Sequence, residues 1–327
     1  MNIKIRRQKT EDRRQTSCLR RLKPTTTHCS LLIAHCFLSL TLTLTLTSPG
    51  WAGGGGSYDK RDEMVLIPEG GFLMGSKEDD GRLGVDLGVD ELPQREVSLK
   101  AFYIDKYEVT IGAYRKFAEL IIDNNRKFAR DNNPLSPFVK GELKGTVNSP
   151  SILLIGGLTG ERARMKKMRV PIADDDFPMS DVSYMEAEAY CKSIGKRLPT
   201  EEEWEKAARG ADGRIWPWGN KFETGMANTS ESKENGTAKS GSFLTDVSPY
   251  DVYDMACNLM EWTSSWYEPY PGSKIERPQF GKEYKVIKGG TWSAPSIPFS
   301  RAAHRHPVKP TENNHSHRYG FRCAKDL

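Results

Sequence analysis

The chain has 327 residues, of which 37% are hydrophobic and 28% charged, a composition typical of a soluble globular protein. The formal net charge is +5, but residues 1–52 carry nine basic and two acidic side chains, and the rest of the chain carries thirty-nine basic and forty-one acidic ones. Nucleic-acid binding needs a basic face on the folded part, so this distribution argues against a nucleic-acid partner.

The first 52 residues predict an export signal. A basic leader ends near Lys23, an apolar run spans Leu31–Leu46, and Gly50 and Ala52 fit the −3 and −1 positions of a cleavage site. The apolar run has about 16 residues, fewer than the roughly 20 that a membrane-spanning helix needs. We therefore expect cleavage after Ala52 and a periplasmic, extracellular or secretory-pathway protein without a stable membrane span. An uncleaved N-terminal anchor is the alternative.

A folded domain is predicted over residues 64–327, after a flexible glycine-rich tether at residues 53–63. Met64–Ser76 alternates short apolar runs with glycine, which predicts a strand, a turn and a second strand. Glu96–Thr110 is a β-rich run that ends where a helix begins. The core-facing residues of this helix would be Tyr114, Phe117, Ala118 and Ile121.

An insertion is predicted at about residues 124–176, where the chain is polar and weakly periodic. Loops of this length are uncommon in compact domains unless they are functional or disordered. We expect the insertion to run over the surface, with one short strand or buried turn at the apolar segment that begins at Ser151.

Two capped helices are predicted after the insertion. Ser183 with Glu186, and then Thr200 with Glu203, have the spacing of a capping box, and a glycine follows each helix. The predicted core residues of the two helices are Ala187, Tyr190, Cys191 and Ile194, followed by Trp204, Ala207 and Ala208.

Cysteine usage predicts little disulfide bonding. If the leader is removed, only Cys191, Cys257 and Cys323 remain, and an odd number allows at most one internal disulfide. Cys191 falls on the apolar face of the first capped helix. We therefore expect it to be a buried small apolar residue rather than a nucleophile.

The segment from Gly195 to Gly210, with the WPWGN motif at Trp216, resembles a signature of the formylglycine-generating-enzyme family, or sulfatase-modifying-factor domain family. Four further stretches match this family in the same order, among them both β-rich segments and the GGTW and GFRC motifs near the C-terminus. The resemblance covers about residues 64–124 and 177–326. It implies a compact, loop-rich α+β fold of C-type-lectin-like character with little regular secondary structure.

The family's copper ligands are replaced in this sequence. Members that make formylglycine carry two cysteines five residues apart after the GG motif, and these bind Cu(I) and activate oxygen to convert a sulfatase cysteine into an aldehyde. Counted from Gly289, the two positions are Ala294 and Phe299, and neither side chain can ligate a metal. Copper-dependent formylglycine formation is therefore not expected.

The resemblance also implies a binding cleft at the former active site. Trp262, Thr291, Trp292 and Arg301 match or neighbour residues of the family's cleft and are candidates to line a pocket. Each of them could equally be a core or rim residue.

Two structural calcium sites are implied by the resemblance, because matching loops in the family hold calcium through carbonyl and side-chain oxygens. Asn228 and the Thr229 carbonyl would serve one site, and Asn258, the Leu259 carbonyl and Glu261 would serve the other. Without the resemblance, the same residues would be solvated loop groups and turn caps.

Four histidines cluster near the C-terminus, and they are candidates for a different metal site. They form two H-x-H pairs, and an extended backbone would place both rings of a pair on one face. Two such pairs could hold Zn, Fe or Cu(II); the alternative is a set of solvated loop histidines. The four residues are His304, His306, His315 and His317.

These observations favour an exported binding or accessory protein that uses the former active-site cleft for a protein, a peptide or a glycan. The alternative is a diverged oxidase or a histidine-ligated metalloenzyme that modifies a protein or a small molecule. The missing cysteine pair favours the first function, and the clustered histidines keep the second open.

Overall fold

The computed structural model describes residues 62–77, 88–119, 174–311 and 318–327, all within a unit that spans Gly56–Leu327. The predicted leader, the tether as far as residue 61 and the insertion as far as residue 173 lie outside the described residues. Within the described ranges, no helix is long and apolar enough to cross a bilayer.

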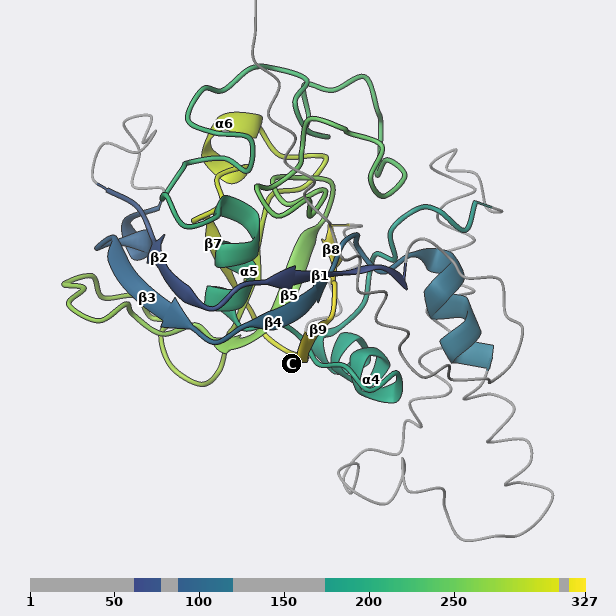
Figure 1. Cartoon of the computed structure of the whole chain (residues 1–327), viewed down its shortest axis with the longest axis horizontal. Coiled ribbons are helices and arrows are strands. Elements are labelled where there is room, and N and C mark those ends of the chain that lie inside the picture. Colours follow the sequence, from purple (N-terminus) through teal and green to yellow (C-terminus); the bar gives the residue numbers. More distant parts are fainter. Residues whose placement is uncertain (1–61, 78–87, 120–173, 312–317) are drawn as a thin grey trace, which may run out of the picture. The chain divides into compact units, whose positions relative to one another are not determined.

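Strands from the start of the domain form two small antiparallel sheets (Figure 1), and both strands predicted over Met64–Ser76 are present. The two predicted strands, β1 and β2, do not pair with each other. Instead β1 pairs with β4, which also pairs with the C-terminal β9, and β2 pairs with β3. The strands are β1 (Met64–Ile67), β2 (Gly70–Met74), β3 (Arg95–Leu99), β4 (Phe102–Asp105) and β9 (Ala324–Asp326).

A four-stranded sheet carries the second half of the domain. Its strand order is β7-β6-β5-β8; β5 and β8 are parallel, and the other neighbours are antiparallel. All four residues of β6 are buried, which places this strand in the core. The strands are β5 (Met260–Trp266), β6 (Lys285–Lys288), β7 (Arg305–Val308) and β8 (Tyr319–Gly320).

Both predicted capping boxes are confirmed. They start α4 (Tyr184–Ser193) and α5 (Glu201–Arg209), and in each the side chain of the cap residue and that of the glutamate accept each other's backbone amide. The described chain also contains α6 (Ser296–Phe299), the 3-10 turn η2 (Val89–Glu91) and helical residues 111–119. Of the core residues predicted for that last helix, Tyr114, Phe117 and Ala118 are buried, and Ile121 lies outside the described residues.

Two predictions for α4 need correction. Ile194 is the C-cap residue and is 46% exposed, so it does not continue the buried face formed by Ala187, Tyr190 and Cys191. Cys191 is buried, but it is not an unbonded apolar residue, because it forms a disulfide with Cys323 next to β9. The two cysteines are 132 positions apart, and only the tertiary fold brings them together.

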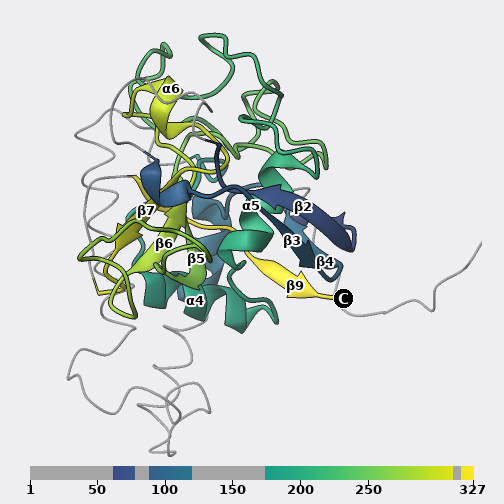
Figure 2. The ribbon, with the colours of Figure 1, turned by 90° about the vertical axis from the view of Figure 1, so that its left-hand side faces the viewer.

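The central element is α5, which contacts β2 of one sheet and β5 and β6 of another (Figure 2). Lys206 fixes the β1–β2 turn, because its Nζ donates to the carbonyls of Pro68 and Gly70 at 2.6 and 2.8 Å. The apolar residues predicted to face the core are all fully buried: Trp204, Ala207 and Ala208.

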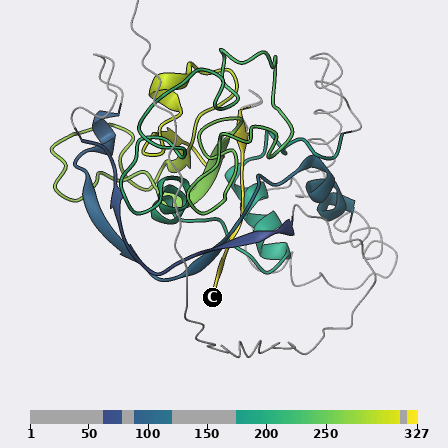
Figure 3. The ribbon, with the colours of Figure 1, turned by 45° about the horizontal axis from the view of Figure 1, so that its top comes forward.

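Residues 210–259 connect α5 to β5 through turns and isolated bridges. These loops gather beside α6 at one end of the fold (Figures 1 and 3). Short strands, few helices and long ordered loops make the loop-rich α+β architecture that the sequence predicts.

Candidate functional site

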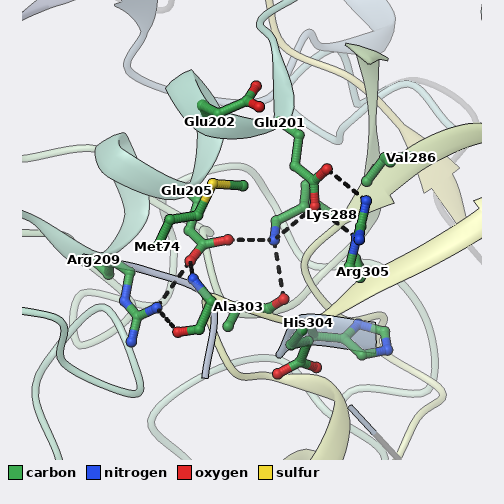
Figure 4. Close-up of polar contacts among 12 residues, drawn as sticks. Met74, Glu201, Glu202, Glu205, Arg209, Val286, Lys288, Ala303, His304 and Arg305 are labelled. Carbon is green, nitrogen blue, oxygen red and sulfur yellow. Dashed lines mark hydrogen bonds and ion pairs between the residues drawn. The ribbon is translucent and has the colours of Figure 1, made fainter. Parts of the chain in front are cut away.

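A buried network of charges fixes both ends of the loop that would hold the copper ligands (Figure 4). Lys288 Nζ donates to Glu205 Oε2 at 2.9 Å and to the Ala303 carbonyl at 3.1 Å, and Glu205 Oε1 accepts from Arg209 at 2.8 Å. Burial alone would raise the pKa of Glu205, but the charges of Lys288 and Arg209 outweigh it and lower that pKa. The loop from Gly289 to α6 therefore begins next to a buried network in which Lys288, Glu205 and Arg209 are paired with one another.

Ala294 and Phe299 lie in this loop and in α6. The Ala294 carbonyl accepts from the Ser230 amide at 3.1 Å, and its amide donates to the Thr291 carbonyl at 2.9 Å. The Phe299 ring packs edge-on against His304, with 5.3 Å between ring centroids. An alkyl and an aryl group thus stand at the two positions, and neither offers a metal donor.

Two of the four pocket candidates belong to the core. Trp262 is fully buried and donates from Nε1 to the Val182 carbonyl at 2.8 Å. Arg301 is 2% exposed and forms a bidentate ion pair with Glu91. Neither side chain is available to a ligand.

Thr291 and Trp292 are the candidates that lie beside Ala294. Thr291 is 4% exposed, and its hydroxyl has no hydrogen-bond partner within the described ranges. Trp292 is partly exposed, and its amide donates to the Asn258 carbonyl at 3.0 Å. Of the four residues predicted to line a pocket, Thr291 and Trp292 therefore remain candidates.

The two predicted calcium loops meet in one hydrogen-bond network. Asn228 Nδ2 donates to Asn258 Oδ1 at 2.9 Å, and this oxygen also accepts the Ala238 amide at 2.8 Å. Thr229 is 2% exposed, and its carbonyl accepts the Ser232 amide at 2.9 Å. The Asn258 side-chain oxygen, which was expected to ligate calcium, therefore already accepts two N–H donors.

Glu261 is also engaged. Its two carboxylate oxygens each accept from Arg322 at 2.7 Å, and Oε2 also accepts from Trp204 Nε1 at 2.7 Å. Glu261 and Arg322 are both fully buried, so the guanidinium neutralises the carboxylate without a metal. With Asn258 and Glu261 held this way and only the Leu259 carbonyl left from the predicted second set, these residues do not fit a calcium ion.

Further buried carboxylates surround Arg322, and their wide separation along the chain hides them from sequence patterns. Glu108 accepts from Asn258 Nδ2 at 2.7 Å, and Asp254 accepts from the Gly241 amide at 2.6 Å. Burial raises the pKa of Glu108 well above its ordinary value and raises that of Asp254 to about 7. Asp246, which accepts from two backbone amides, has its pKa raised well above normal for the same reason.

The first histidine pair does not share a face. His304 is 7% exposed, and its Nδ1 lies 3.1 Å from the Gly289 carbonyl, whereas His306 on β7 is exposed. Burial lowers the pKa of His304 to about 3, so this ring is neutral and donates from Nδ1 to the carbonyl. The predicted shared face is therefore wrong for this pair, and His315 and His317 lie outside the described residues. Among the residues that the structure describes, no three His, Cys, Asp or Glu side chains cluster as metal ligands would.

Cys257 is the free thiol of the described residues, and it packs against the loop. Cys257 is 1% exposed, and its Sγ lies 2.7 Å from where a Cβ on Gly290 would stand. Burial raises the pKa of this thiol well above its ordinary value, which makes it a poor nucleophile. The second glycine of the GGTW motif is therefore required by close packing against Cys257.

Residues 56–327 match the family described as the sulfatase-modifying factor enzyme 1-like domain. The chain belongs to this family. It is 33% identical to the inactive Cα-formylglycine-generating enzyme 2 of Bos taurus, over 80% of this chain and 87% of that protein. It is also 32% identical to the formylglycine-generating enzyme of Bos taurus, over 83% of this chain and 77% of that protein. Because the two identities are nearly equal, overall similarity does not separate the active from the inactive relative.

Solved structures support the fold. PvdO from Pseudomonas aeruginosa has 24% identity and a TM-score of 0.51, over 81% of this chain and 94% of that chain. The Treponema denticola variable protein 1 has 17% identity and a TM-score of 0.53, over 81% of this chain and 95% of that chain. At these identities the likeness concerns architecture alone.

Proposed function

We propose that this chain is an exported member of the sulfatase-modifying-factor family that does not make formylglycine and that binds a partner or ligand at the former active site. One observation carries the proposal: Ala294 and Phe299 stand where the family's two cysteines would be. A Cu(I) ion needs soft donors, and the hydroxyls of the neighbouring Ser293 and Ser296 are hard ones.

The packing around Phe299 supports the view that this side chain replaces a family cysteine without restoring a metal site. Its ring packs against His304, which is neutral and hydrogen-bonded to the Gly289 carbonyl. An uncharged aromatic contact thus occupies the position where a thiolate would stand. The inactive Bos taurus relative offers a precedent for a member of this family without the activity.

The Cys191–Cys323 disulfide supports export. Structural disulfides form and persist in oxidising compartments and are rare in the cytosol. The leader composition points the same way. N-terminal sequencing of protein from the source cell tests this part, and we expect a mature chain that starts after Ala52. A chain that still starts at Met1 would contradict it.

Cu(I) titration tests whether the loss of the cysteine pair at Ala294 and Phe299 abolishes copper binding. We expect wild-type protein to bind no stoichiometric Cu(I) in competition with a colorimetric chelator. The double variant Ala294→Cys/Phe299→Cys should gain binding, because it restores two thiolates on a rigid loop. Tight 1:1 binding by the wild type would refute the proposal, and the variant serves as the positive control.

A further inference from the structure

The WPWGN motif and the nearby Phe222 form a group of three aromatic rings that we call the aromatic shelf: Trp216, Trp218 and Phe222. The two indole planes lie within 8° of parallel with centroids 6.3 Å apart, and the Phe222 ring lies 5.4 and 6.4 Å from them. Trp216 is buried, and Trp218 and Phe222 are partly exposed. The shelf thus presents two aromatic rings to solvent on a buried third.

The shelf is held rigidly. Trp216 Nε1 donates to Ser300 Oγ at 3.0 Å, and Trp218 Nε1 donates to the Lys221 carbonyl at 3.1 Å. The Trp218 ring also packs against a small buried cluster made of Ala227, Ala256 and Cys257. Rings fixed in this way lose little conformational entropy when a ligand stacks on them, which favours binding.

The shelf adjoins the former active site. Ser300 directly follows α6, which contains Phe299, and Cys257 packs against Gly290 of the GGTW motif. The loops that carry the shelf gather beside α6 (Figures 1 and 3). The shelf therefore lies next to the loop of Ala294 and Phe299, where we propose that a ligand binds.

The charges next to the shelf cancel. Lys221 and Glu223 form an ion pair at 2.7 Å, with side chains 85% and 58% exposed, so they offer polar groups without a net charge. The exposed Asn220 adds an amide, whose oxygen accepts the Ile215 amide at 2.8 Å. A charged ligand gains little here, whereas a neutral ligand rich in hydroxyls finds hydrogen-bonding groups beside aromatic faces.

We propose that the aromatic shelf binds neutral saccharides. Pyranose rings with equatorial hydroxyls expose flat C–H faces, and these carry the partial positive charge that the negative face of an aromatic ring attracts. Trp218 and Phe222 would each take a sugar face, and Asn220, Lys221 and Glu223 would hydrogen-bond to the rim hydroxyls. This inference rests on the binding role proposed above and names its ligand class.

Calorimetric titration with cellohexaose, chitohexaose and maltohexaose tests the proposal, with a polyproline peptide as the competing ligand class. We expect at least one hexasaccharide to bind and Trp218→Ala to weaken that binding about tenfold or more, since one stacked ring is lost. Trp218→Phe keeps an aromatic face and should stay within about threefold of the wild type. No saccharide binding, or binding of polyproline alone, would overturn the proposal.

Trp266→Ala is the matched control, because Trp266 is also a partly exposed indole but lies on β5 against Lys285. It should bind the saccharide as the wild type does; an equal loss in both alanine variants would overturn the assignment to the shelf. Thermal melts confirm that each variant is folded, and Phe222→Ala replaces Trp218→Ala if that variant is not. Formation of formylglycine would refute the proposed function and leave the saccharide proposal open. If the protein makes no formylglycine and binds no saccharide, only the saccharide proposal is refuted.

Discussion

Thr291 and Thr263 are both buried threonines, but their hydroxyls differ. Thr263 donates to the Val286 carbonyl at 2.7 Å, whereas the Thr291 hydroxyl has no partner in the part of the chain that the structure describes. We expect Thr291→Val to leave the free energy of unfolding unchanged or raise it by up to about 1 kcal/mol, and Thr263→Val to lower it by about 1–2 kcal/mol. Urea unfolding measures both. A loss at Thr291 as large as at Thr263 would show that this hydroxyl has a partner after all.

Glu261 provides the test of calcium at the residue scale. Because its carboxylate is neutralised by Arg322, we expect Glu261→Gln to lower the free energy of unfolding by about 3 kcal/mol, the usual result of leaving a buried charge unpaired. A chelator should leave the melting temperature of the wild type unchanged. A melting temperature that falls with chelator and recovers with Ca²⁺ would show a bound ion that stabilises the native state.

The disulfide is the feature of greatest consequence at the scale of elements, because it ties α4 to the segment before β9. Closing a loop of 132 residues removes much conformational freedom from the unfolded chain, so Cys323→Ser should lower the free energy of unfolding by about 4–5 kcal/mol. Cys257→Ser, at the free buried thiol, is the control and should cost less. Equal losses in denaturant titrations would mean that packing at each cysteine, not the cross-link, sets the effect.

Local signals predicted the first strands and the capped helices, but they predicted neither the strands of the second half of the domain nor the site. The capping boxes of α4 and α5 depend on residues three positions apart, so sequence alone predicts them. The Glu261–Arg322 pair and the Cys191–Cys323 bond join distant segments, and no residue spacing along the chain predicts them. The family resemblance pointed to the loop of Ala294 as the former active site, but it could not tell that Trp262 is buried in the core rather than lining a pocket.

The stability of the whole molecule should depend on pH through its buried carboxylates. Burial raises the pKa of Asp254 to about 7, against about 4 in an unfolded chain, so the folded protein holds a proton that the unfolded chain releases. The stabilisation is then complete below about pH 4 and is lost as pH rises through about 7. His304 acts in the opposite sense because burial lowers its pKa to about 3.

The variant Asp254→Asn separates these contributions, because it removes the carboxyl group and keeps His304. We expect the free energy of unfolding of the wild type, relative to this variant, to fall between about pH 4 and pH 7. Denaturant unfolding at several pH values measures this difference. A difference that stays constant or rises with pH would show that Asp254 is ionised in the folded protein.

The central claim concerns the chemistry of the whole chain: a member of the sulfatase-modifying-factor family that no longer makes formylglycine. Mass spectrometry of a sulfatase-type cysteine peptide, incubated with the full protein, Cu(I), oxygen and a thiol reductant, tests it most directly. The bovine formylglycine-generating enzyme, to which this chain is similar, serves as the positive control. We predict an unchanged peptide mass with this chain, because Ala294 and Phe299 supply no thiolate. A mass loss at cysteine that matches conversion of the thiol to an aldehyde would contradict the account.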